Sequence, residues 1–177
     1  MKFVPTKLQG AYLINIEAQN DERGFFARSW CESEFKQQGL NPCVKQCNIS
    51  FNTKKGTLRG MHYQAEPHAE VKLVRCTRGS IYDVIIDLRK DSDTYKQYYG
   101  VELSGANHSM LYIPEGFAHG FQTLEDNAEV LYYMAHHYVA DAARGVRWDD
   151  PAFGIEWPLE SQRIMSPRDA QYPDYDV

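Results

Sequence analysis

The 177-residue chain lacks three features that would place it in other broad classes of protein. It has no apolar stretch near the ~20 residues that a membrane-spanning helix requires, so we expect no membrane as a partner. Its basic residues are scattered and its formal net charge is −5, which disfavours nucleic acid as a partner. It also has no low-complexity stretch, linker or internal repeat. We therefore expect a single domain over residues 1–177.

Cysteine is scarce, with only Cys31, Cys43, Cys47 and Cys76. The first residues, MKFVP, are not followed by a long apolar segment, so an export signal is not expected. This predicts a cytoplasmic protein whose thiols are reduced. The spacing of Cys43 and Cys47 resembles half of a zinc site, but the second pair of ligands is missing. We expect no structural metal.

Segments with helical character are also few, and short apolar runs separated by turn residues dominate the chain. The clearest strands are residues 71–77 and 80–87, which we expect to pair as a hairpin around Arg78 and Gly79. Similar strands are expected at 12–16, 46–50, 57–64, 99–103, 109–113, 120–124 and 128–134. Many short strands at close spacing predict an all-β sandwich or barrel. A helix is expected over 29–38 and a capped turn at 166–169.

Several side chains of chemical interest fall on positions that face inward in these strands. With strict alternation, Leu58, Gly60, His62 and Gln64 share one face of their strand. Lys72 shares a face with the small apolar residues Val74 and Cys76, and a buried ammonium group needs an anion nearby. An inward His is often a core residue whose hydrogen bonds are made by its neighbours, so His62 alone is weak evidence for a catalytic role.

Further inward candidates strengthen that evidence. His119 lies in residues 113–122 (IPEGFAHGFQ), Tyr132 lies on the face of Val130 and Met134, and Asp169 follows late in the chain. Together, His, Lys, Tyr and Asp side chains in one barrel are the groups needed to remove a proton beside a ketone and to return one elsewhere.

The sequence resembles the dTDP-4-dehydrorhamnose 3,5-epimerase family along nearly its whole length. The resemblance is carried by residues 21–26 (DERGFF), 56–64 (GTLRGMHYQ), 72–74 (KLV), 83–89 (DVIIDLR), 113–121 (IPEGFAHGF), 149–151 (DDP) and 155–158 (IEWP). It implies a cupin-like jelly roll, a homodimer, a nucleotide-sugar substrate and no cofactor. The polar segment 21–29 is suited to an edge strand that adds to the sheet of another subunit.

The resemblance also implies roles for individual residues. His62 would be the general base, Asp169 its orienting carboxylate, Lys72 the stabiliser of the enolate and Tyr132 the acid on the opposite face. Because strict alternation places Arg59 opposite His62, a bulge at Gly60 is indicated. The implied substrate-binding residues are Arg59, His119, Gln46, Asn48 and Arg168, with Arg23 and Phe26 reaching the nucleotide bound by the partner subunit and Arg28 approaching the base.

Arg28 departs from the family pattern, in which many dTDP-specific members have Glu at a position that approaches the base. Arginine only donates hydrogen bonds, and cytosine presents O2 and an unprotonated N3 as acceptors. A CDP-linked sugar, inverted at C3 or C5 alone, is therefore an alternative substrate. Arg28 could equally contact phosphate or the carbonyl groups of thymine.

Two other functions compete with the epimerase hypothesis. A metal-dependent cupin is suggested by His62, His68, Glu70 and His119, but position 64 is Gln where a tight His-x-His pair would have its second ligand. A sugar-nucleotide binding module without catalysis would be expected to lack one of His62, Lys72, Tyr132 and Asp169. All four are present, which favours the enzyme.

Overall fold

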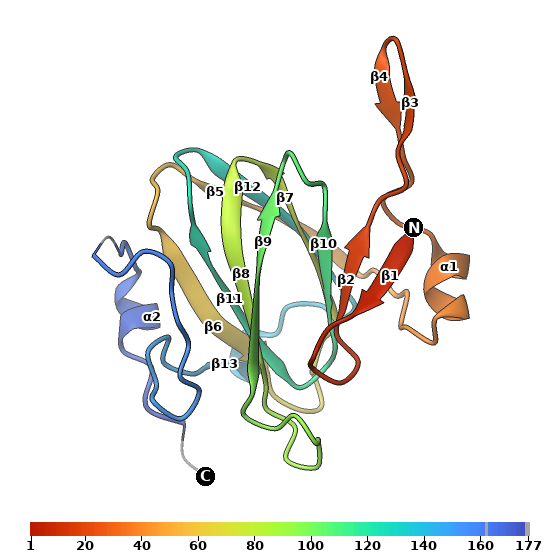
Figure 1. Ribbon diagram of the computed structural model, residues 1–177. Helices are drawn as coiled ribbons and strands as arrows, with labels where there is room; N and C mark the ends of the chain where they lie inside the picture. Colours follow the sequence, from red (N-terminus) through yellow and green to blue (C-terminus); the bar gives the residue numbers. More distant parts are fainter. Residues whose placement is uncertain (162, 176–177) are drawn as a thin grey trace.

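Two antiparallel sheets packed face to face form the body of the molecule in the computed structural model, which describes residues 1–161 and 163–175 (Figure 1). The larger sheet has the order β1 (Lys2–Pro5), β2 (Tyr12–Asn15), β10 (Met110–Ile113), β7 (Lys72–Arg78), β12 (Ala128–Met134) and β5 (Gln46–Asn52). The smaller sheet has the order β13 (Ala143–Gly145), β6 (Leu58–Gln64), β11 (Phe117–Thr123), β8 (Ser80–Asp87) and β9 (Tyr98–Ser104). The predicted all-β jelly-roll class is confirmed.

The remaining elements are short. Strands β3 (Gln19–Asp21) and β4 (Gly24–Phe26) form a hairpin that extends away from the sandwich (Figure 1). The helices are α1 (Glu32–Gln37), the 3-10 helix η1 (Ala140–Ala142) and α2 (Pro167–Ala170), and no helix in the described residues is long and apolar enough to cross a membrane. Helix α1 begins later than the predicted residue 29, and Gly39 follows it with a φ of +70°, as expected of a C-terminal stop.

Strand alternation places one apolar core between the two sheets. Val74 and Cys76 of β7 and Ile81 and Ile85 of β8 are fully buried there, and Val130 of β12 joins them. A second apolar cluster lies on the outer face of the smaller sheet, under the segment that contains Phe153 and Trp157. Because this segment precedes α2 in the chain, the second cluster holds the C-terminal part of the chain near β6.

The predicted hairpin between residues 71–77 and 80–87 is wrong. Strand β7 belongs to the larger sheet and β8 to the smaller one, so the chain crosses between sheets at Gly79. Gly79 has a φ of +69°, and a Cβ atom there would lie 3.2 Å from the Cα atom of Ala128. The tight turn was correctly located, but a turn signal does not reveal whether the next strand pairs with its predecessor or packs against it.

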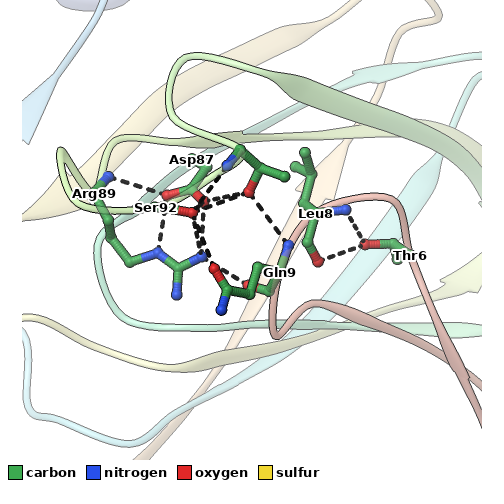
Figure 2. Close-up of polar contacts among 7 residues, drawn as sticks. Thr6, Leu8, Gln9, Asp87, Arg89 and Ser92 are labelled. Carbon is green, nitrogen blue, oxygen red and sulfur yellow. Dashed lines mark hydrogen bonds and ion pairs between the residues drawn. The ribbon is translucent and has the colours of Figure 1, made fainter.

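A buried carboxylate joins the loops at the end of β8 (Figure 2). Asp87 is fully buried and accepts hydrogen bonds from Arg89 Nη2 at 2.7 Å, Ser92 Oγ at 2.6 Å and Thr94 Oγ1 at 2.7 Å. Arg89 Nη2 also donates to the main-chain oxygen of Gln9 at 2.7 Å. Burial alone raises the pKa of Asp87, but the hydrogen bonds from Arg89, Ser92 and Thr94 outweigh it and hold the pKa below its usual value.

We expect Asp87→Ala to lower the free energy of unfolding by about 3 kcal/mol at pH 7, because it leaves the half-buried donors of Arg89, Ser92 and Thr94 without their acceptor. The pKa of Asp87 is lower in the folded chain than in the unfolded chain. Its contribution to stability is therefore complete above the unfolded pKa and is lost as pH falls through the folded pKa. Urea unfolding should therefore separate variant and wild type widely at pH 7 and less so at about pH 3. The exposed Asp91→Ala is the control, and equal effects of the two substitutions would contradict this role.

Candidate active site

A cavity of about 440 Å³ is bounded by residues of both sheets. Strands β5, β7 and β12 of the larger sheet form one wall, and β6, β11 and β13 of the smaller sheet form the other. Eight residues that were predicted for catalysis or substrate binding line it: Gln46, Asn48, Arg59, His62, Lys72, His119, Tyr132 and Arg168. Asp169 lies behind His62.

A bulge in β6 decides which of its side chains face the cavity. His62 pairs with His119 and Arg59 pairs with Phe121, so β6 has one residue more than β11 between these two pairs. As a result Arg59 and His62 both line the cavity, while Leu58 packs into the apolar cluster on the other side of the sheet. The predicted bulge is confirmed, whereas the prediction that Leu58 and His62 share a face is wrong.

Two glycines permit this bulge. Gly60 has a φ of +129°, and a Cβ atom on it would lie only 2.5 Å from the Cα atom of Gly120 on β11. Real Cβ atoms do not approach another backbone so closely, so any side chain at position 60 would force β6 and β11 apart. The two glycines therefore keep the strand that carries His62 in place.

The short helix α2 presents a carboxylate to His62. Ser166 caps the helix by accepting a hydrogen bond from the Asp169 amide at 3.1 Å, and Asp169 Oδ1 lies 2.7 Å from His62 Nε2. Burial raises the pKa of Asp169, but the hydrogen bond and charge of His62 and the Gly60 amide outweigh it and lower the pKa. An ionised Asp169 only accepts hydrogen bonds, so Nε2 carries hydrogen and the Nδ1 lone pair of neutral His62 is free to accept a proton.

His119 has a carboxylate of its own. His119 Nε2 lies 2.7 Å from Asp83 Oδ1, and Asp83 is fully buried on β8. Because His119 is the register partner of His62, the two imidazoles are carried by adjacent positions of neighbouring strands. Each is oriented by a buried acid, which fixes how both rings face the cavity.

Lys72 and Tyr132 belong to the opposite wall. The Lys72 ammonium lies 2.6 Å from Glu70 Oε1 and 3.5 Å from the main-chain oxygen of His62, so the buried lysine has the anion that it was expected to need. Burial raises the pKa of the Tyr132 phenol, the charge of Glu70 raises it further and Arg59 opposes the increase. Tyr132 is therefore kept in its neutral, proton-donating form.

Some cavity residues were missed from sequence. Ser50 continues the period-two pattern of Gln46 and Asn48 on β5 and could have been found by it. Glu70, considered from sequence only as a metal ligand, precedes Lys72 by two positions, so the same period predicts that it faces the cavity. Tyr138 and Arg144 lie at the end of a loop and in a three-residue strand, where no periodic signal exists.

Three predicted substrate-binding residues do not line the cavity of their own chain. Arg23, Phe26 and Arg28 lie on or directly after the β3–β4 hairpin, which extends away from the sandwich (Figure 1). Arg23 pairs with Asp21 at 2.5 Å, and Arg28 pairs with Glu34 at 2.6 Å. The side chain of Phe26 is 75% exposed.

The ligand set expected of a metal-dependent cupin is not gathered. Within residues 1–161 and 163–175, no three His, Cys, Asp or Glu side chains are grouped so that they could hold a metal ion. His62 and His119 are each bonded to a carboxylate, and Glu70 is paired with Lys72. His68 lies against His136 instead. The four cysteines are free, as predicted.

The sequence model of the dTDP-4-dehydrorhamnose 3,5-epimerases matches residues 5–176. The chain belongs to this epimerase family. It is 44% identical to the dTDP-4-dehydrorhamnose 3,5-epimerase of Methanothermobacter thermautotrophicus, over 97% of this chain and 92% of that protein. The predicted family resemblance is confirmed, and with it the assignment of the chain to the isomerases.

Solved structures of dTDP-sugar epimerases have the same fold. The dTDP-4-dehydrorhamnose 3,5-epimerase from Bacillus anthracis, with TDP and PPi bound, superposes with a TM-score of 0.94 at 40% identity, covering 98% of this chain and 99% of that one. The dTDP-6-deoxy-D-glucose-3,5-epimerase from Legionella pneumophila, in complex with dTDP-4-keto-L-rhamnose, gives 0.90 at 34% identity, with 99% of each chain covered. The comparison covers the whole sandwich of this epimerase, including the cavity.

We expect Gly60→Ala to destabilise the epimerase by about 3 kcal/mol, the sum of backbone strain at positive φ and a clash with Gly120. Gly24→Ala is a matched control, because Gly24 has a φ of +127° but, apart from its chain neighbours, no atom of the described residues lies within 4 Å of the place that its Cβ atom would occupy. It should cost only the strain, about 1 kcal/mol. Thermal and urea unfolding of both variants test this, and similar losses would show that contact with Gly120 does not matter.

Proposed function

We propose that this epimerase inverts C3 and C5 of dTDP-4-dehydro-6-deoxyglucose to give dTDP-4-dehydrorhamnose. The observation that carries the proposal is the arrangement of His62 with Asp169, Lys72 and Tyr132 around one cavity. A proton next to an existing ketone is acidic enough for acid–base catalysis, so the proposed reaction involves no redox step and no cofactor.

The first step is proton abstraction by His62. Its Nδ1 takes the proton from the carbon beside C4, and the C–H electron pair forms a C=C bond as the C4 carbonyl becomes an enolate oxygen. Asp169 stabilises the imidazolium ion that results. Lys72 provides a hydrogen-bond donor and a positive charge for the enolate oxygen, which can lower the barrier by several kcal/mol in a water-poor site.

The second step is proton return from Tyr132. His62 is on β6 of the smaller sheet and Tyr132 is on β12 of the larger sheet, so a sugar between them meets the base on one face and the phenol on the other. The enolate re-forms the carbonyl while its carbon takes the Tyr132 proton, and delivery from the opposite face inverts the centre. The imidazolium loses its proton and the phenolate regains one before the next turnover.

Charge at the cavity suits a nucleotide diphosphate. The cationic side chains that line it are Arg59, Lys72, Arg144 and Arg168. Guanidinium groups bind phosphate oxygens through paired hydrogen bonds, so Arg59, Arg144 and Arg168 are assigned to the diphosphate. Gln46 and Asn48, whose side chains bond each other at 3.0 Å, are assigned to the sugar hydroxyl groups, and His119 to the sugar or phosphate.

We expect the wild-type protein to incorporate deuterium from D2O at C3 and C5 of dTDP-4-dehydro-6-deoxyglucose, followed by NMR. His62→Ala should lose exchange at both carbons by at least about 1000-fold, because the base is missing. Tyr132→Phe should lose inverted product more than exchange, since His62 can return a proton to the same face. Exchange in the CDP-linked sugar is measured alongside, because Arg28 makes that sugar the alternative substrate.

Each result bears on one part of the proposal. Exchange at a single carbon would reduce the activity to a mono-epimerase, and a preference for the CDP sugar would overturn the dTDP assignment. No exchange with either nucleotide would remove the proposed reaction altogether. Full exchange in His62→Ala would show that another group is the base.

We also propose that the epimerase is a homodimer in which the β3–β4 hairpin of each chain reaches the cavity of its partner. Two features support this. Arg23, Phe26 and Arg28 lie outside the cavity of their own chain, and Phe26 is largely exposed. The outer face of the edge strand β5 also exposes Ile49 and Phe51, at 66% and 44%, a pair of apolar side chains that a partner could cover.

Sedimentation at micromolar concentration is expected to show a dimer, and Ile49→Asp should shift it towards monomer. A mixing experiment tests the shared site. His62→Ala retains an intact hairpin and Phe26→Ala retains an intact base, so mixed dimers should recover activity that neither variant has alone. A monomeric wild type, or mixtures no more active than their components, would contradict the shared site.

A further inference from the structure

Glu70 is a cavity residue that the proposed reaction does not use. It lies two positions before Lys72, is 8% exposed and is the only carboxylate among the described residues that line the cavity. Its Oε1 atom lies 2.6 Å from the Lys72 ammonium group. Its Oε2 atom is buried and has no hydrogen-bond partner within residues 1–161 and 163–175.

A carboxylate buried with only one partner is costly, so a structural role is not a sufficient explanation. Apolar side chains in place of the whole Glu70–Lys72 pair would avoid that cost, whereas removal of Glu70 alone would leave the buried Lys72 ammonium group without its anion. Lys72 is itself buried, and it is the residue assigned to the enolate oxygen. Glu70 therefore determines both the position of the Lys72 ammonium group, which is the proposed electrophile, and the charge around it.

The same carboxylate acts on Tyr132. Strand β12 pairs with β7 so that Met134 is opposite Lys72 and Tyr132 is opposite Val74, which brings Tyr132 onto the same wall as the ion pair. The negative charge of Glu70 adds to burial in raising the pKa of Tyr132, and Arg59 from β6 opposes it. The other ionisable side chains that line the cavity are His62, Tyr63, His119, Tyr138, Arg144 and Arg168.

We propose that Glu70 is a positioning residue that holds the Lys72 ammonium group against the sugar C4 oxygen and presents its negative charge to Tyr132 on the same wall of the cavity. This inference rests on the proposed epimerase function. It has one side chain act on two groups of the proposed reaction, the Lys72 ammonium group and the Tyr132 phenol.

Two substitutions distinguish the effect of Glu70 on the position of Lys72 from the effect of its negative charge on Tyr132. Glu70→Gln keeps the shape and removes the charge, so the ratio of phenolate to phenol at Tyr132, measured at about pH 10, should rise, and the alkaline limb of kcat should move to lower pH. Glu70→Asp keeps the charge but draws the carboxylate back from Lys72. It should lower kcat about tenfold with KM changed less than about threefold. The ratio of phenolate to phenol at Tyr132 should stay close to that of the wild type.

Tyr132 ionisation is followed by NMR of protein labelled with 13C at tyrosine Cζ, and Tyr132→Phe identifies the resonance. Glu129→Gln is the control, because Glu129 is on the same strand and accepts a hydrogen bond from the Thr77 hydroxyl at 2.7 Å away from the cavity. Glu129→Gln should change neither the ionisation of Tyr132 nor kcat. Circular dichroism and thermal unfolding establish that each variant is folded.

The titration needs no substrate, so it is independent of the proposed reaction. A wild type that fails to epimerise the dTDP sugar would overturn the function, whereas an unchanged Tyr132 ratio in Glu70→Gln would overturn the role of Glu70. If Glu70→Asp turns over as fast as wild type, Glu70 does not position Lys72. Lower stability in both variants, with Tyr132 unaffected, would reduce Glu70 to a structural residue.

Discussion

The contact between β6 and β11 at Gly60 and Gly120 is the constraint on which the arrangement of the cavity depends. Backbone atoms meet there without side chains between them, and the resulting bulge turns both Arg59 and His62 towards the larger sheet. The same register sets His62 beside His119. A regular β6 would leave His62 or Arg59 on the outer face, among apolar side chains. This wall of the cavity is therefore built by a departure from regular strand geometry, at a site where only glycine fits.

The two histidines and the lysine that face the cavity are each held by a buried acid. Asp169 bonds His62, Asp83 bonds His119 and Glu70 pairs with Lys72, at distances between 2.6 and 2.7 Å. These acids come from a C-terminal helix, a central strand and the segment before β7, so folding brings together separate parts of the chain to fix one site. In a site with little water such charges interact strongly, and their positions matter more than their number. The proposed chemistry relies on that fixed geometry.

The proposed function gives the sandwich and the β3–β4 hairpin different roles. The sandwich encloses the groups proposed to move protons, whereas the β3–β4 hairpin carries Arg23 and Phe26 away from it (Figure 1). Apolar side chains exposed on the hairpin and on β5 are easier to explain if a second chain covers them. Proton transfer would then belong to one subunit, and part of nucleotide recognition to the other.

Period-two alternation by itself determined most strands and correctly turned Lys72 and Tyr132 inward, because a strand's faces follow directly from residue order. Sequence resemblance supplied the family and the pairing of Asp169 with His62, for which no periodic signal exists. Only the tertiary structure decided that β7 and β8 lie in different sheets, that Leu58 faces away from His62, and that Asp83 is the partner of His119. The physical reason is common to all three: sheet membership, bulges and the pairing of side chains across strands depend on contacts between residues distant in sequence, which local pattern does not encode.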